Sequence, residues 1–182
     1  MRTFCVCLIS AVLIVTGSVL AQERCPFDAF DTVLQYVGEW QVDSKQWIDD
    51  EAEHSDATAK MTADLENCLV VERLTGLRMD RAYSARAWYS YDPFNEVFQR
   101  AWIDATLGMM QYSQGPLTPE GIEFSGTQLI DGREARLRQI YSRIEDDSFT
   151  VLEQRSTNSG RTWETFWLRR YRRVQSELRG TS

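Results

Sequence analysis

The sequence predicts an all-β protein that folds as a single antiparallel up-and-down barrel of eight to ten strands, preceded by one short helix. Apolar and polar residues alternate with a period of two along most of the chain after Gly38, which is typical of half-buried strands. Turn-forming residues interrupt this pattern at short intervals. The connections are too short for crossover helices, so successive strands should pair as a meander, and closure into a barrel would leave no exposed edge.

The N-terminus predicts an export signal. Arg2 provides a positive charge, residues 4–15 are mostly apolar, and Val19-Leu20-Ala21 is a suitable cleavage site. The apolar stretch is short for a bilayer span and polar residues follow it, which leaves a retained membrane anchor as the alternative. We therefore expect a periplasmic or secreted protein with no integral membrane segment after signal removal. The chain divides into an export signal (1–21), a barrel domain (22–174) and a disordered tail (175–182).

Residues 26–37 predict the helix, because Pro26 suits a first helical position and Phe30 and Val33 share one stripe. Gly38 should end this helix. The acidic segment 49–55 is expected to be an exposed loop. The predicted strands lie near residues 39–48, 56–66, 68–76, 81–91, 96–104, 108–115, 120–130, 134–145, 148–156 and 161–173.

Two cysteines remain after the predicted signal, Cys25 and Cys68. An even number of cysteines in an exported protein predicts a disulfide. A pair of reduced, buried thiols is the alternative.

The last predicted strand is arginine-rich, and both of its faces carry apolar and charged residues. The alternation of odd and even positions alone does not decide which face points into the barrel. We expect the inner face to be the one with Trp163, Trp167, Arg169 and Tyr171. The turn before this strand, Ser156 to Trp163, resembles the Asp-box of sialidases with Asn158 in place of Asp, and a single copy predicts a hairpin rather than a sialidase propeller.

Gly38-Glu39-Trp40 follows the predicted helix directly and resembles the Gly-x-Trp signature of lipocalins and the wider calycin group. In those proteins the tryptophan closes one end of the barrel and stacks on an arginine from the last strand. The resemblance implies that Arg173 or a neighbour has this role here, as a cation–π contact.

A second resemblance covers nearly the whole chain after the signal. The motifs that carry it are Gly38-x-Trp40, Cys68-x-x-x-Glu72, Tyr91-Asp92-Pro93, Trp102-Ile103-Asp104, the turn that ends at Trp163, and Tyr171-x-Arg173. In this order they resemble the DUF1579 family of bacterial, often exported proteins, which implies a lipocalin-like barrel and no defined activity. The chain departs from that pattern where Phe98 and Arg100 stand in place of the usual Trp and Gln.

Composition and motifs argue against several function classes. The 27 acidic residues outnumber the 20 basic ones, which disfavours nucleic acid as a partner. His54 is the only histidine, so a Ser-His-Asp triad or a multi-histidine metal site is difficult to build. There is no Gly-rich phosphate loop. We therefore predict no catalytic residue, no metal and no cofactor, and the sequence carries no signal for an oligomeric state.

The predicted function is to bind a small, partly apolar molecule inside the barrel, with arginine available for an anionic group. Arg169-x-Tyr171 resembles the Arg and Tyr pair that holds a carboxylate in fatty-acid-binding proteins. The alternative is that this arginine has a structural role and stacks on Trp40. The candidate ligand residues are Trp40, Trp88, Trp102, Tyr141, Trp163, Trp167 and Tyr171 as apolar walls, and Glu72, Arg138 and Arg169 as groups that orient a polar end.

Two other functions fit the same barrel. One is an enzyme, such as an isomerase or cyclase, that uses buried carboxylates or an Arg/Tyr anion pocket. The other is a structural or interaction module with a filled interior. A cavity lined by aromatic residues and one or two arginines would favour the binding protein, convergent carboxylates the enzyme, and a solid interior the interaction module.

Overall fold

The computed structural model describes residues 25, 27–48, 51–78, 80–130 and 132–175. The predicted export signal, residues 1–21, lies outside the described residues, as does all of the predicted tail except residue 175. No helix in the described part of the chain is long and apolar enough to cross a bilayer.

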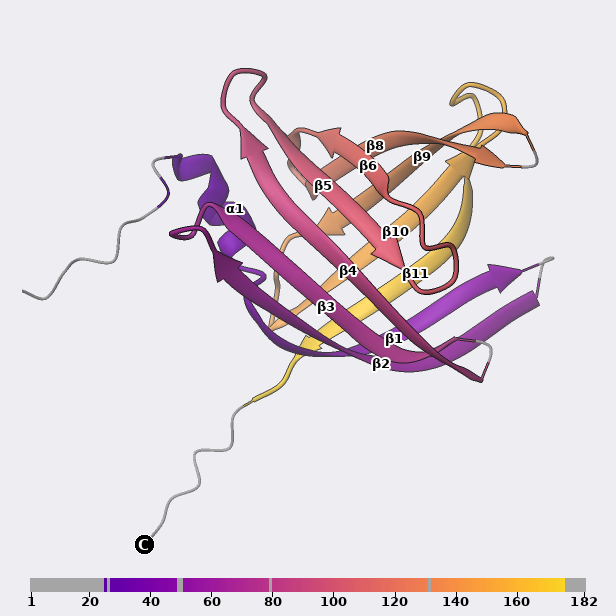
Figure 1. Cartoon of the computed structure of the whole chain (residues 1–182), viewed down its shortest axis with the longest axis horizontal. Helices are drawn as coiled ribbons and strands as arrows, with labels where there is room; N and C mark the ends of the chain where they lie inside the picture. The colour runs from indigo at the N-terminus through magenta and orange to yellow at the C-terminus, as the bar shows by residue number, and fades with distance from the viewer. Residues whose placement is uncertain (1–24, 26, 49–50, 79, 131, 176–182) are drawn as a thin grey trace, which may run out of the picture.

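The described residues form one antiparallel sheet of eleven strands that closes into a barrel (Figure 1). Neighbouring strands follow the order β6-β5-β4-β3-β2-β1-β11-β10-β9-β8-β7, and a pairing between β6 and β8 closes the ring. This confirms the predicted meander barrel, to which β7 adds a two-residue strand. The strands are β1 (Gly38–Ile48), β2 (Glu51–Asp64), β3 (Leu69–Arg78), β4 (Arg81–Asp92), β5 (Val97–Asp104), β6 (Gln111–Gly115), β7 (Leu117–Thr118), β8 (Gly121–Ile130), β9 (Arg133–Ser142), β10 (Ser148–Ser156) and β11 (Glu164–Arg173).

The predicted helix is present but shorter than expected. A 3₁₀ turn, η1 (Asp28–Phe30), leads into a single α-helical turn, α1 (Asp31–Leu34). Phe30 and Val33 are buried, as their spacing indicates. The helix ends early because the amides of Tyr36 and Val37 donate to carbonyls three residues back, a tighter turn that leads the chain into β1.

The prediction of an acidic loop at residues 49–55 was wrong for residues 51–55, which begin β2 (Glu51–Asp64). They pair with the end of β1 down to Ile48 opposite Glu51. The long β1 provides backbone partners up to its last residue, so pairing continues where the acidic composition indicated a loop. Their side chains remain exposed or half-buried.

The helix and the first strand close one end of the barrel around Trp40, which is fully buried. Its indole N–H donates to the Tyr36 carbonyl at 2.9 Å, and the Arg173 guanidinium lies 4.2 Å from the ring centroid. The arginine also donates to the Val37 and Gln35 carbonyls. Trp40 and Arg173 are paired in register on the first and last strands, so this stack joins the two ends of the meander as the lipocalin resemblance implies.

Gly38 is required at this junction. Its φ is +148°, and a Cβ there would lie 2.5 Å from the Nη1 atom of Arg173. A larger residue would therefore strain the backbone and require the Arg173 guanidinium to shift.

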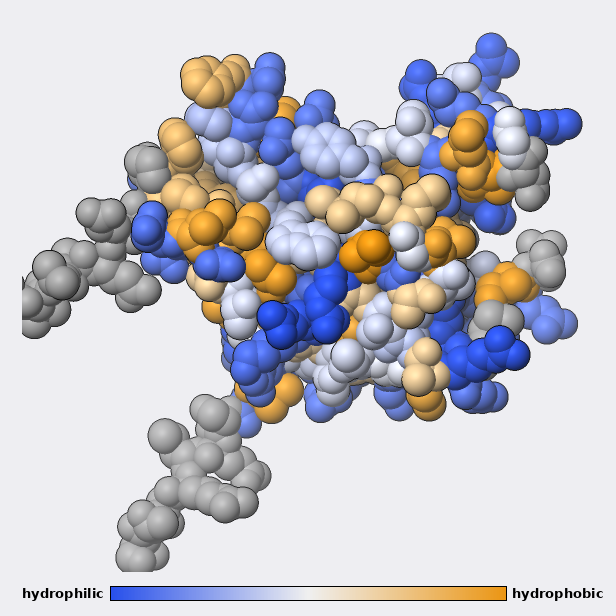
Figure 2. Space-filling model, in the orientation of Figure 1, coloured by the Kyte–Doolittle hydropathy of each residue, from blue (hydrophilic) through white to orange (hydrophobic). Residues whose placement is uncertain are grey.

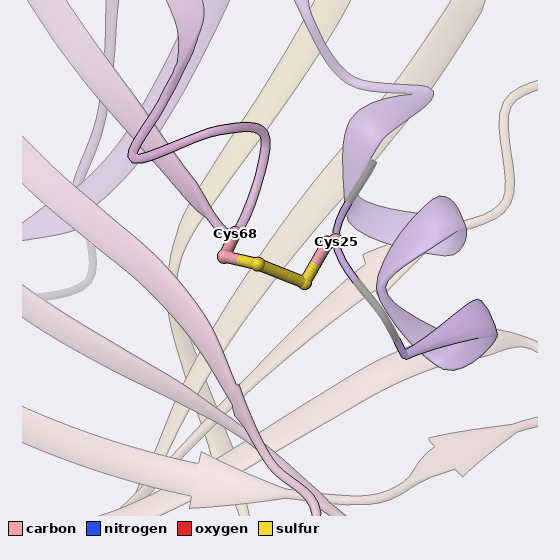
Figure 3. The surroundings of a disulfide bond; sticks show 2 residues. All are labelled: Cys25 and Cys68. Carbon is pink, nitrogen blue, oxygen red and sulfur yellow. A yellow bond between two sulfur atoms is a disulfide. The ribbon is translucent and has the colours of Figure 1, made fainter. Parts of the chain in front are cut away.

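The predicted disulfide between Cys25 and Cys68 is formed (Figure 3). It links the segment before η1 to the turn that leads into β3, with a Cα–Cα distance of 4.9 Å. The bond fixes the closing helix to the barrel wall.

Candidate functional site

A pocket of about 290 Å³ opens at the end of the barrel opposite α1. The end of β1 and start of β2, and the end of β8 and start of β9, flank this end of the barrel, and the surface is hollowed between the two strand pairs (Figures 1 and 2). The polar side chains that line the pocket are Gln46, Arg78, Asp104, Gln111, Gln128, Glu153 and Arg155, and the apolar ones are Trp47, Ile48, Trp102, Leu107, Ile130, Leu137, Phe166 and Trp167.

Two indoles and an ion pair form the floor of this pocket. The rings of Trp102 and Trp167 meet edge to face with centroids 6.3 Å apart. The Arg169 guanidinium lies 5.1 Å from the first ring and 4.4 Å from the second, and it pairs with Glu153. Both charged side chains are buried. The floor therefore presents aromatic surface over a cation that is already neutralised by a carboxylate.

The wall of the pocket carries two further arginines with different surroundings. Arg155 forms a two-point ion pair with Glu164 at 3.1 Å. Arg78 instead donates to neutral groups, to Gln46 Oε1 at 2.9 Å and Thr106 Oγ1 at 3.3 Å. Among the described residues Arg78 is therefore the lining arginine that no carboxylate neutralises.

A second buried polar cluster lies deeper in the barrel, around Glu72. Its carboxylate accepts hydrogen bonds from the hydroxyl groups of Tyr89 at 2.5 Å and Tyr171 at 2.9 Å. The Tyr89 and Tyr141 hydroxyl groups are 2.9 Å apart, and Arg100 Nε donates to Tyr141. Burial, and then the Glu72 carboxylate, raise the pKa of Tyr89 well above its usual value. The tyrosines therefore stay protonated and serve as donors.

The cluster is expected to stabilise the barrel rather than bind a ligand, because the cavity lined by Tyr89 and Tyr141 measures about 10 Å³, which is too small for a ligand. We predict that Glu72→Leu lowers the free energy of unfolding by about 2 kcal/mol, since it leaves the Tyr171 hydroxyl without its acceptor. Glu72→Gln keeps an acceptor and should cost about half as much. Urea denaturation checks both values, and equal effects of the two substitutions would contradict this role.

The structure divides the sequence-predicted ligand residues among four places. Trp102 and Trp167 line the pocket, and Arg169 lies beneath them. Glu72, Tyr141 and Tyr171 belong to the deeper cluster. Trp40 closes the opposite end of the barrel. Trp88, Arg138 and Trp163 are half-buried on the outer wall.

The expected inner face of the last strand was right for Trp167, Arg169 and Tyr171, which are buried, and wrong for Trp163. The pairing of β10 with β11 shifts by one residue at a bulge, because Glu153 lies opposite Trp167 but Gln154 lies opposite Thr165. The extra residue in β11 reverses the face that the side chains before it occupy. Trp163 therefore lies outside, with the Arg138 guanidinium 4.3 Å from its ring.

Most residues that line the pocket were not among the candidate ligand residues, and four of them show why. Glu153 lies on the same face of β10 as the apolar residues Phe149 and Val151. This alternation could have identified it as an inward-facing residue. Phe166 reaches the pocket because of the bulge, which has no clear sequence signal. Arg78 ends β3 beyond the predicted strand, and Gln46 lies in β1 with no distinguishing pattern.

The turn before β11 has the structural role that a single Asp-box-like copy predicts. Asn158 Oδ1 accepts from the Thr162 amide at 3.0 Å, and Ser156 Oγ accepts from the Gly160 amide at 2.8 Å. These bonds close the turn with side-chain acceptors, and Gly160 takes a φ of +90°.

Comparison with known proteins places the chain in one family. No curated protein matches it. Residues 29–173, which include every strand of the barrel, match the family described as "Protein of unknown function (DUF1579)". The chain belongs to the DUF1579 family.

Proposed function

We propose that this protein binds a small, partly apolar molecule in the open-end pocket. The observation that carries the proposal is a pocket of about 290 Å³ whose floor is two indoles and whose wall includes Arg78 and Arg155. A concave site with aromatic surface and a few converging polar groups is the usual form of a small-molecule site. This is the arrangement expected of the binding protein rather than of a solid interaction module.

The binding site is proposed to be restricted to the mouth of the barrel. Below the pocket the interior is filled by side chains, and the cavities there measure about 10 Å³ each. A long acyl chain inside the barrel does not fit this interior. The ligand is therefore a compact molecule that rests on Trp102 and Trp167, or the compact end of a larger one.

We also propose that the protein acts outside the cytoplasm. The Cys25–Cys68 disulfide supports this location, because such bonds persist mainly in oxidising compartments. The signal-like residues 1–21 support it independently. Cell fractionation with N-terminal mass analysis tests the proposal, and a cytosolic, uncleaved chain would contradict it.

Leu137→Trp is the variant that tests ligand binding, because Leu137 lines the pocket wall. The larger ring should fill part of the space and remove a bound molecule. We expect native mass spectrometry of wild-type protein, purified from its own host, to show a retained small molecule that the Leu137→Trp variant lacks.

Leu129→Trp is the matched control, since Leu129 lies one residue from the rim on β8 and is 70% exposed. It adds the same ring outside the pocket and should leave the bound mass unchanged. A melting curve verifies that Leu137→Trp is folded, because overpacking costs about 1–3 kcal/mol. Equal retention by both variants, or no retained molecule in the wild type, would refute the proposed function.

A further inference from the structure

We infer that Arg78, Tyr83 and Arg169 form a subsite for an oxyanion, such as a carboxylate, sulfate or phosphate group, at the edge of the open-end pocket. The inference deepens the proposed function, on which it rests: the oxyanion is the polar end of the bound molecule. The three side chains line one inner cavity, directly beside the pocket. The two spaces share Gln46, Arg78 and Trp167 in their walls.

The first argument is that donors in this cavity have no acceptor. The Tyr83 hydroxyl and the Nε and Nη1 atoms of Arg169 are buried and form no hydrogen bond with any described residue. Tyr83 is 6% exposed and Arg169 is fully buried. Buried donors of this kind are costly when unpaired. An acceptor that enters the cavity would satisfy both side chains at once.

The second argument is charge. Arg169 is neutralised by Glu153 and Arg155 by Glu164, but Arg78 has no carboxylate at ion-pair distance among the described residues. The nearby Asp104 accepts from the amides of Thr106 and Leu107. The uncompensated positive charge at the mouth therefore belongs to Arg78, in a chain whose net charge is −7.

Arg78 is also held in place before any ligand arrives. Its Nε and Nη1 atoms donate to Gln46 and Thr106. Its guanidinium lies 5.6 Å from the Tyr83 ring and 5.7 Å from the Trp167 ring. Hydrogen bonds and aromatic stacking of this kind orient the planar group for an oxyanion.

The neighbouring surface supports the same ligand class. A groove of about 590 Å³ adjoins the site, and its lining includes Arg78, Arg81, Tyr83 and Thr106 but no acidic residue. The inner cavity, about 10 Å³, accommodates one oxygen atom. In the proposed geometry one oxygen of the anion enters this cavity between Tyr83 and Arg169, and another pairs with Arg78 in the open pocket.

Tyr83→Phe is the sharpest variant, because it deletes one hydroxyl group that has no partner in the unliganded protein. Without added anion, the melting temperature should be unchanged or slightly higher. The probes are inorganic sulfate and 4-phenylbutyrate, measured by calorimetric titration against 4-phenylbutyramide, the uncharged analogue of the carboxylate. We expect the wild type to prefer the carboxylate over the amide by about tenfold, and Tyr83→Phe to lose most of this preference.

Arg78→Met removes the charge and keeps the apolar stem, while Arg78→Lys keeps a cation. The methionine variant should bind carboxylate and amide equally, and the lysine variant should retain part of the preference. A preference that survives both Tyr83→Phe and Arg78→Met would overturn the subsite. So would a wild type that neither sulfate nor phenylbutyrate binds or stabilises against heat.

The outcomes separate this inference from the proposed function. If the amide and the carboxylate bind equally and Leu137→Trp blocks both, the ligand pocket stands and the oxyanion subsite falls. If sulfate binds through Tyr83 while no organic probe binds and the host protein carries no retained molecule, the anion site stands and the proposed function falls.

Discussion

Replacing Arg169 with methionine is expected to lower the free energy of unfolding by about 3–5 kcal/mol. The side chain is fully buried and forms an ion pair with Glu153, which is 6% exposed. Removing the cation leaves the carboxylate in the barrel interior without a charged partner, and an uncompensated buried charge is strongly destabilising. Methionine retains much of the apolar contact with Trp102 and Trp167, so the loss reports mainly on the charge. Chemical denaturation provides the measurement.

The double variant Arg169→Met/Glu153→Leu separates charge from packing. With both charges removed, neither member of the ion pair is left buried without its partner, and the stability should return to within about 1 kcal/mol of the wild type. Glu153→Leu alone leaves the cation unpaired and should be nearly as damaging as Arg169→Met. If the double variant were as unstable as the sum of the two single ones, the cost would arise from lost packing, and the charge argument would be wrong.

The fold could be predicted from the sequence because its determinants are local and repeated. Alternation in each strand, short turns between strands, and Gly38-Glu39-Trp40 after the helix all indicate the same meander barrel. The length of the helix was overestimated, because apolar spacing does not show where tertiary contacts begin. Tyr36 has helical spacing from Val33, yet its hydroxyl donates to the Ser142 carbonyl of β9 at 2.7 Å.

The site could be predicted only in part, because its position depends on features that alternation does not contain. Trp102 and Trp167 were predicted as aromatic residues of the ligand site, and they form the pocket floor. Because of the bulge opposite Glu153, Phe166 lines the mouth of the pocket, where Trp163 was expected. Arg78 lies beyond the predicted strand 68–76, and it is distinguished by having no carboxylate at ion-pair distance among the described residues, which only the three-dimensional structure reveals.

The polar interior explains why the alternation of residues in the last strand did not show which face points into the barrel. Arg169 and Tyr171 are inside because Glu153 and Glu72 supply their partners from β10 and β3. Glu153 lies on the preceding strand, 16 residues from Arg169, whereas Glu72 is separated from Tyr171 by 99 residues. A charged residue on a strand therefore does not by itself mark the solvent face. The pairing that permits its burial is a property of the assembled barrel.

Reduction of the Cys25–Cys68 disulfide is expected to lower the free energy of unfolding by about 4 kcal/mol. The bond closes a loop across a sequence separation of 43 residues, and loop-closure entropy of the unfolded chain gives this magnitude. For a domain of this size, it corresponds to a drop in melting temperature of roughly 10 °C. Differential scanning calorimetry with and without reductant measures the change, and Cys25→Ser/Cys68→Ser serves as the permanently open form.

The turn before Cys68 is the place where the reduced protein should open first. Leu65, Glu66 and Asn67 have φ values of 47°, 54° and 67°, a left-handed conformation that costs roughly 1–2 kcal/mol for each such residue. The disulfide and the pairing of β2 with β3 hold this strained turn in place, so opening the bond should release it. Proteolysis should then cleave the reduced protein first between residues 65 and 68. An unchanged melting temperature, with both thiols reactive in the native protein, would show that the bond does not stabilise the fold.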